Sequence, residues 1–203
     1  MLRREPLNPP KYVYPVDEWR MVEKQYYPRF QAQMETIFSI GNGYLGMRGV
    51  CEEVTPCTEN GTFINGFYES WPIVYGEEAF GFAKTGQTIV NVTDSKIIKL
   101  YVDDEPFSLS TANLLSFERV LDMKAGTLNR ELVWETPSGK KVAIKSRRLI
   151  SLEHKHLAAI EYEVTVLNAK APVVISSELE NHKHIASNNN DPRKAKGFKG
   201  RVL

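Results

Sequence analysis

Short runs of alternating apolar and polar residues, separated by turn-forming residues, are the feature that most limits how this chain can fold. In the clearest run, Ala158 to Val166, one set of alternate residues is hydrophobic and the other includes Glu161, Glu163 and Thr165. Because strand side chains alternate between two faces, this pattern predicts a half-buried strand. We expect further strands at residues 19–27, 62–68, 88–92, 97–102, 107–109, 116–121, 128–136, 141–149 and 173–179.

Two of the connections between these segments carry hairpin-turn chemistry. Residues 103–106 (Asp-Asp-Glu-Pro) and 137–140 (Pro-Ser-Gly-Lys) each lie between two expected strands. The strands recur roughly every 8–12 residues, and no helical pattern of useful length follows residue 30. The sequence therefore predicts an all-β fold, either an antiparallel β-sandwich or a barrel.

Composition sets limits on partners and location. The net charge is +1, so no global field favours nucleic acid or an anionic membrane, and we expect neither as a partner. The first residues lack the apolar core of a signal peptide, and no run approaches the roughly 18 apolar residues of a membrane span. We expect a cytoplasmic protein in which Cys51 and Cys57 are reduced.

The chain divides into three segments by composition. Residues 1–15 hold four of the eleven prolines and are expected to form an extended N-terminal segment. Residues 16–187 form the expected β-sandwich domain. Residues 188–203 are polar and then basic, which indicates a solvated loop or a truncated continuation of the domain.

A glycine-rich stretch admits two chemical interpretations. Asn42-Gly43 between apolar residues predicts a tight turn between two strands. Residues 41–46 also match G-x-G-x-x-G, the dinucleotide fingerprint, and Glu69 follows about 20 residues later. That fingerprint requires a helix opening at the third glycine to hold the pyrophosphate, and no helical periodicity follows Gly46. We therefore expect a structural turn, with Gly46 and Gly49 allowing close backbone packing.

No spacing in the sequence supports a metal site or a catalytic mechanism. His-Lys-His occurs at residues 154–156 and 182–184, but neither pair has a third ligand at a sequence spacing that is typical of a metal site. The acidic pair Glu52-Glu53 would point to opposite faces of a strand and could not act together on one bond. We therefore expect no catalytic residue, no metal and no cofactor in this chain.

Several ordered blocks resemble one enzyme family. The segment Glu35-x-x-Phe38-x-x-Gly41-Asn-Gly-Tyr-Leu-Gly-x-Arg48-Gly49 resembles the N-terminal signature of glycoside hydrolase family 65, the maltose, trehalose and kojibiose phosphorylases and related hydrolases. Residues 66–72, 117–130, 134, 139, 147–151 and 188–193 resemble later blocks of the same family. The residues of the expected structural motif are Glu35, Gly41, Asn42, Gly43, Tyr44, Gly46, Arg48 and Gly49.

The resemblance implies a fold and a parent enzyme. The fold would be a large two-sheet antiparallel supersandwich of the galactose-mutarotase type, here truncated at its C-terminal end. An (α/α)6 barrel absent from this chain would hold the catalytic acid and the phosphate site. The parent would be an inverting α-glucoside phosphorylase or a hydrolase that acts on an α-linked glucose disaccharide, with inorganic phosphate as co-substrate and a homodimeric assembly.

Three functions are compatible with this resemblance. The first is a non-catalytic domain that packs on the barrel. The second is an independent carbohydrate-binding module, whose aromatic side chains would stack on sugar rings. The third is a mutarotase-like enzyme using His154, His156 and Glu161. For the motif we expect Glu35 or backbone carbonyls to pair with Arg48, and Arg48→Ala to harm folding or docking rather than chemistry.

Overall fold

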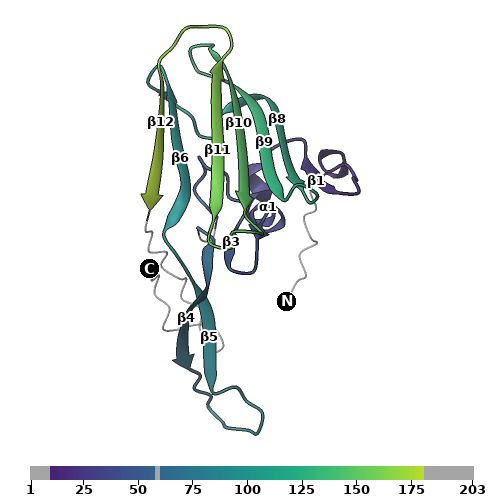
Figure 1. Cartoon of the computed structure of the whole chain (residues 1–203), viewed down its shortest axis with the longest axis vertical. Coiled ribbons are helices and arrows are strands. Elements are labelled where there is room, and N and C mark those ends of the chain that lie inside the picture. The colour runs from purple at the N-terminus through teal and green to yellow at the C-terminus, as the bar shows by residue number, and fades with distance from the viewer. Residues whose placement is uncertain (1–9, 58–59, 181–203) are drawn as a thin grey trace.

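The computed structural model describes residues 10–57 and 60–180, which form three antiparallel sheets and little helix (Figure 1). The helical elements are η1 (Lys11–Val13), η2 (Pro28–Phe30) and α1 (Gln31–Ile37). The strands are β1 (Arg20–Glu23), β2 (Ile40–Gly41), β3 (Leu45–Met47), β4 (Thr62–Pro72), β5 (Thr85–Asn91), β6 (Asp94–Val102), β7 (Glu105–Pro106), β8 (Asn113–Asp122), β9 (Thr127–Glu135), β10 (Lys141–Ile150), β11 (Ala158–Val166) and β12 (Val173–Glu180).

Two of the sheets form a sandwich. The larger sheet has the strand order β1-β8-β9-β10-β11, and the smaller sheet has the order β12-β6-β7. Their inner faces enclose the main hydrophobic core, in which Leu100 and Val102 of β6 pack with Leu132 and Trp134 of β9 and Ile144 of β10. The predicted antiparallel β-sandwich is confirmed in this arrangement.

The smaller sheet covers one end of the larger sheet's inner face, and helix α1 covers the other. Phe30, Met34 and Phe38 pack as a second core against Leu128, which precedes Leu132 on the same face of β9. Residues 49–53 lie over the inner face between these two cores, where they contact side chains of β8, β9 and β10. This middle zone is polar, in contrast to the two cores on either side of it.

The third sheet, β2-β3-β4-β5, carries a long hairpin away from the sandwich. Strands β4 and β5 leave the body at its lower end in Figure 1 and extend well beyond it. The register between them breaks between Phe63 and Tyr68, and Gly66 adopts a positive φ of 102° there. We call residues 66–89, the part of the hairpin beyond this break, the β4–β5 arm.

The structure agrees with most of the expected strands and differs at four places. Of the strand expected at residues 19–27, only Arg20–Glu23 (β1) is present. The expected hairpins are present as β6–β7, with Asp103 and Asp104 at positive φ, and as β9–β10. Helix α1 was not expected: its Gln31–Ile37 segment is only 7 residues long, too short to show a helical period. Residues 107–109 fill the core without forming a strand, and β4 continues through Trp71-Pro72, which the sequence had placed in a loop.

Within residues 10–57 and 60–180, no helix is both long enough and apolar enough to cross a membrane. The expected segment 188–203 and the pair His182 and His184 lie outside the described residues. The expected boundaries at residues 15 and 187 are not tested by the fold.

Candidate functional site

The glycine-rich motif folds into the β2–β3 hairpin, and Asn42 holds its turn. The Asn42 side-chain oxygen accepts hydrogen bonds from the backbone N–H groups of Tyr44 (3.0 Å) and Leu45 (2.8 Å). Gly43 adopts a φ of 84°, a conformation that favours glycine. The Asn42 amide nitrogen then donates to the carbonyls of Ser151 (2.6 Å) and Lys155 (3.0 Å), so one side chain fixes both its own turn and the loop between β10 and β11.

The same hairpin fixes the base of the β4–β5 arm. The backbone N–H of Asn65 donates to the Tyr44 carbonyl at 2.8 Å, and its side-chain amide donates to the Gly43 carbonyl at 3.1 Å. On the other side, the Tyr44 ring packs edge-on against His156, with the centroids 4.4 Å apart. The motif therefore joins the sandwich, the loop at residues 151–157 and the arm.

The motif glycines have different roles. A Cβ on Gly49 would lie 2.6 Å from Phe38 Cβ and 2.8 Å from the Phe38 backbone, so only glycine fits there. A Cβ on Gly41 would lie 3.1 Å from the Leu45 carbonyl oxygen. A Cβ on Gly46 would meet nothing within 4 Å. The expected close packing is therefore present at Gly49 and absent at Gly46, which faces open space.

Glu35 and Arg48 lie together behind the hairpin. The Arg48 guanidinium is 3.7 Å from a Glu35 carboxylate oxygen and donates to the Thr36 hydroxyl at 3.1 Å. The buried Glu35 carboxylate also accepts from the Gln31 amide (2.8 Å) and from the Cys57 backbone N–H (3.0 Å). The pair therefore ties α1 to the loop that follows the hairpin.

A row of polar side chains crosses the inner face of the larger sheet next to this motif. The paired registers place one residue from each of the five strands in line: Glu23, Arg119, Arg130, Ser146 and Tyr162. We call these five residues the polar row. Glu23 forms an ion pair with Arg119 at 2.6 Å, and both side chains are buried. The row occupies inward positions that sequence alternation assigns to a hydrophobic core.

Residues 49–53 cover this row, and we call them the plug. Glu53 accepts two hydrogen bonds of 2.6 Å from the two terminal nitrogens of Arg130. It also accepts a hydrogen bond of 2.5 Å from the Tyr162 hydroxyl. The Glu52 carboxylate lies 3.1 Å from the Arg130 guanidinium and 2.5 Å from the guanidinium of Arg148, which is on the neighbouring strand β10. The expectation that Glu52 and Glu53 point apart was wrong, because they lie in a turn rather than a strand and converge on one guanidinium.

The electrostatics of the plug favour fixed charges. Burial alone would raise the pKa of Glu52, but the Arg148 and Arg130 guanidinium groups outweigh it and hold that pKa at about 2. Burial and the Glu53 carboxylate raise the pKa of Tyr162, which therefore remains a hydrogen-bond donor. Burial likewise raises the pKa of the Cys51 thiol, which accepts a hydrogen bond from Arg119. Each of these groups keeps one protonation state at neutral pH.

This arrangement is suited to holding the fold together rather than to proton transfer. A general acid or base needs a pKa near the working pH and contact with substrate, whereas Glu52 and Glu53 are buried and bound to arginines. Among the described residues, no group of three or more His, Cys, Asp or Glu side chains is placed to hold a metal ion. His154 lies in an exposed loop and Glu161 on the exposed outer face of β11, where it pairs with Arg147.

One hollow in the described surface does not resemble a sugar site. It has a volume of about 580 Å³ and lies between the β6–β7 side of the sandwich and the end of β9, near Ser108, Asn113 and Thr136. Its only aromatic lining residue is Trp134, which is 2 % exposed and packs on Phe107 at a centroid distance of 5.0 Å. A ring that is already covered cannot stack on a sugar.

Comparisons with known proteins identify the chain's relatives. The family model "Glycosyl hydrolase family 65, N-terminal domain" matches residues 21–203. An alpha,alpha-trehalose phosphorylase from Thermoanaerobacter brockii is 44 % identical over 95 % of this chain and 26 % of that protein. A kojibiose phosphorylase from Caldanaerobacter subterraneus subsp. tengcongensis is 30 % identical over 80 % of this chain and 20 % of that protein. A solved structure titled "Putative kojibiose phosphorylase from human microbiome" matches with a TM-score of 0.64 and 27 % identity, over 75 % of this chain and 20 % of that one. The chain thus spans about a quarter or less of the length of these relatives.

Proposed function

The chain belongs to the N-terminal domain of glycosyl hydrolase family 65, and from this we propose that it is the non-catalytic β-sandwich domain of an inverting α-glucoside phosphorylase. The parent enzyme would cleave an α-linked glucose disaccharide with inorganic phosphate as co-substrate, in an (α/α)6 barrel outside this chain, and would act as a homodimer. The related hydrolysis, with water in place of phosphate, is the second reaction that this family resemblance allows.

One observation in the structure carries the proposal. The acidic side chains nearest the family motif, Glu35, Glu52 and Glu53, are buried and held by arginines and amide groups of this chain. They are therefore available for stabilising the domain and not for protonating a glycosidic oxygen. Free cysteines at positions 51 and 57 support a reducing, cytoplasmic location for the parent enzyme.

Phosphorolysis assays test the proposal directly. The 203-residue chain and its full-length parent are each incubated with trehalose, kojibiose or maltose and inorganic phosphate, and glucose 1-phosphate is measured. We expect phosphate-dependent release by the parent and none by the chain alone. Release of glucose 1-phosphate by the chain alone would contradict the proposed non-catalytic role. A parent that releases only glucose would contradict the proposed phosphorolysis.

Titration separates this role from a carbohydrate-binding module. We expect calorimetry of the chain with the same disaccharides to show no saturable binding up to about 10 mM, a range in which even weak specific sites are detected. Saturable millimolar binding that is lost in Trp71→Ala but kept in Trp19→Ala would favour the module instead. Both tryptophans lie outside the main core, but Trp71 also packs on Gly86 of the opposite strand. A loss of binding in Trp71→Ala therefore counts only if the thermal unfolding of that variant matches wild type.

A further inference from the structure

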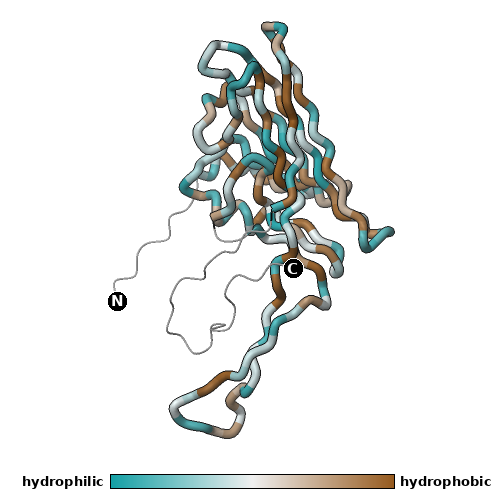
Figure 2. The backbone as a smooth tube through the Cα atoms, turned by 90° about the vertical axis from the view of Figure 1, so that its left-hand side faces the viewer, coloured by the Kyte–Doolittle hydropathy of each residue, from teal (hydrophilic) through white to brown (hydrophobic). Residues whose placement is uncertain are grey.

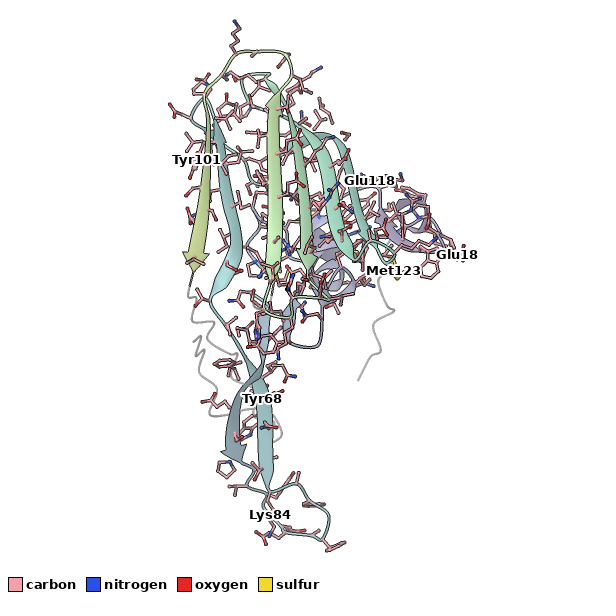
Figure 3. All side chains as sticks on the ribbon, viewed as in Figure 1. Glu18, Tyr68, Lys84, Tyr101, Glu118 and Met123 are labelled. Carbon is pink, nitrogen blue, oxygen red and sulfur yellow. The ribbon has the colours of Figure 1, made fainter. Side chains whose placement is uncertain are left out.

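The β4–β5 arm presents aromatic and aliphatic side chains to solvent. Phe67, Tyr68 and Phe82 are each about half exposed, and Phe80 is completely exposed (107 %). Val74 and Ile89 of the arm are also exposed. Figure 2 shows hydrophobic segments at the far end of the arm, and Figure 3 places Tyr68 near its base and Lys84 near its tip.

The arm is ordered by its own contacts. At the tip, the Tyr75 and Phe82 rings pack with their centroids 4.9 Å apart, and the Ile73 N–H donates to the Lys84 carbonyl at 2.9 Å. Nearer the body, Trp71 lies across from Gly86, where a Cβ would come within 2.5 Å of the indole ring. A ring packed over a strand glycine stiffens a hairpin.

This order makes the exposed rings suitable for binding. A two-stranded hairpin alone is marginally stable in water, so the contacts within the arm are needed to hold its exposed rings in place. Clustered apolar side chains on a projecting element mark an interaction surface. Phe80 stands on a loop that is already held in shape by Tyr75 and Phe82. A preordered aromatic side chain at the centre of a patch is the usual form of a binding hot spot.

The charge of the arm limits what it can bind. Residues 66–89 contain three glutamates, at positions 69, 77 and 78, and one lysine, at position 84, a net charge of −2. Two arms packed tip to tip would bring Glu77 and Glu78 of both copies together, which is unfavourable. A complementary partner is therefore apolar at its centre and basic at its rim.

We propose that the β4–β5 arm docks through its Phe80 tip into an apolar pocket with a basic rim on the catalytic part of the same parent polypeptide. This inference rests on the proposed function. The chain matches only 26 % of the trehalose phosphorylase, so about three quarters of such a parent is available to supply the pocket. The arm is fixed at its base by Asn65, which links the docking to the motif hairpin.

Photo-crosslinking of the full-length parent tests the partner. Phe80 is replaced by benzoylphenylalanine, and the same replacement at Val16, which is equally exposed but outside the arm, serves as the control. We expect position 80 to give an intramolecular crosslink to a peptide outside residues 1–203, with no product at twice the mass, and position 16 to give none. A product of dimer mass would show a second copy as the partner and overturn the inference. A crosslink within residues 1–203, or none above the Val16 level, would also overturn it.

Thermal unfolding gives an independent readout. Phe80→Ser should lower the unfolding temperature of the parent by at least about 2 °C while leaving that of the 203-residue chain unchanged, and Val16→Ser should change neither. An unchanged parent would contradict the docking. If the parent phosphorolyses a disaccharide but position 80 fails both tests, only the docking is wrong; if both tests succeed without phosphorolysis, only the proposed function is wrong.

Discussion

The polar row and the β4–β5 arm reverse the usual distribution of residues in opposite ways. The row and its plug place three carboxylates and two arginines in the interior, whereas the arm places Phe80 in solvent. The interior charges all have partners within the chain, at distances of 2.5 to 3.1 Å. No described residue outside the arm covers Phe80. Buried groups with internal partners indicate a structural role, and exposed rings indicate a partner elsewhere.

The comparison predicts its largest effect at Arg130. Arg130→Met would leave Glu52 and Glu53 buried side by side without their shared cation, and such a loss typically costs about 3–5 kcal/mol of unfolding free energy. The matched control is Lys145→Met, which removes an exposed cation 3.7 Å from Glu131 on the outer face of the same sheet. Urea denaturation should show a large loss for the first variant and little change for the second.

Arg130→Lys keeps the prediction testable if Arg130→Met does not fold. Lysine retains the charge but cannot form the two parallel hydrogen bonds to Glu53, so its stability should fall between wild type and Arg130→Met. Equal stabilities for wild type and Arg130→Lys would show that the geometry of the row does not matter. The charge at position 130, and not the two parallel hydrogen bonds, would then stabilise the fold.

The second prediction concerns pH. The pKa of Glu52 in the folded chain is about 2, below its ordinary value of 4.5, so the folded state binds this proton less readily than the unfolded state. The contribution of Glu52 is therefore complete above about pH 4.5 and is lost as the pH falls towards 2. Glu52→Gln should be clearly less stable than wild type at pH 7, and the difference should shrink on acidification. A difference that stays constant from pH 7 to 2.5 in urea denaturation would exclude this linkage.

The third prediction separates two motif glycines near the plug. Gly49→Ala places a methyl group 2.6 Å from Phe38 Cβ, and forcing an atom into a packed site typically costs about 1–3 kcal/mol. Gly46→Ala places the same group in open space and should change stability by about 0.5 kcal/mol or less. Thermal or urea unfolding of the two variants measures the difference. Equal losses would mean that the motif needs its glycines for another reason than close packing at Gly49.

The sequence predicts much of the sandwich because alternation and turn residues act locally. Ala158–Val166 is found as a strand with the expected bounds, and the turn at residues 137–140 connects β9 to β10. The polar row was accessible in part by the same rule, since Arg130 shares a face with Leu128, Leu132 and Trp134. Alternation alone would have placed that arginine inside the protein.

The remaining features depend on contacts between segments far apart in the chain. Glu53 and Arg130 are 77 positions apart, and no local pattern shows that a turn would carry the carboxylate to the guanidinium. The same holds for Asn42, whose two carbonyl partners lie more than 100 positions away. The direction of the β4–β5 arm depends on the register break at Gly66, whose long-range consequence the sequence does not reveal.

The smallest expected effect is at the arm, and it completes the comparison. In the 203-residue chain, Phe80→Ser should leave the unfolding midpoint unchanged, because a fully exposed ring gains nothing from folding. The matched change in the core, Phe107→Ser, removes a ring that is 5 % exposed and packs on Trp134, and it should cost about 3–5 kcal/mol. Binding of a hydrophobic dye to the folded chain should fall in Phe80→Ser, since the most exposed ring of the arm is lost. A destabilised Phe80→Ser chain would mean that the ring is covered within the isolated chain in solution. The arm would then need no external partner, and the contrast between the two regions would fail.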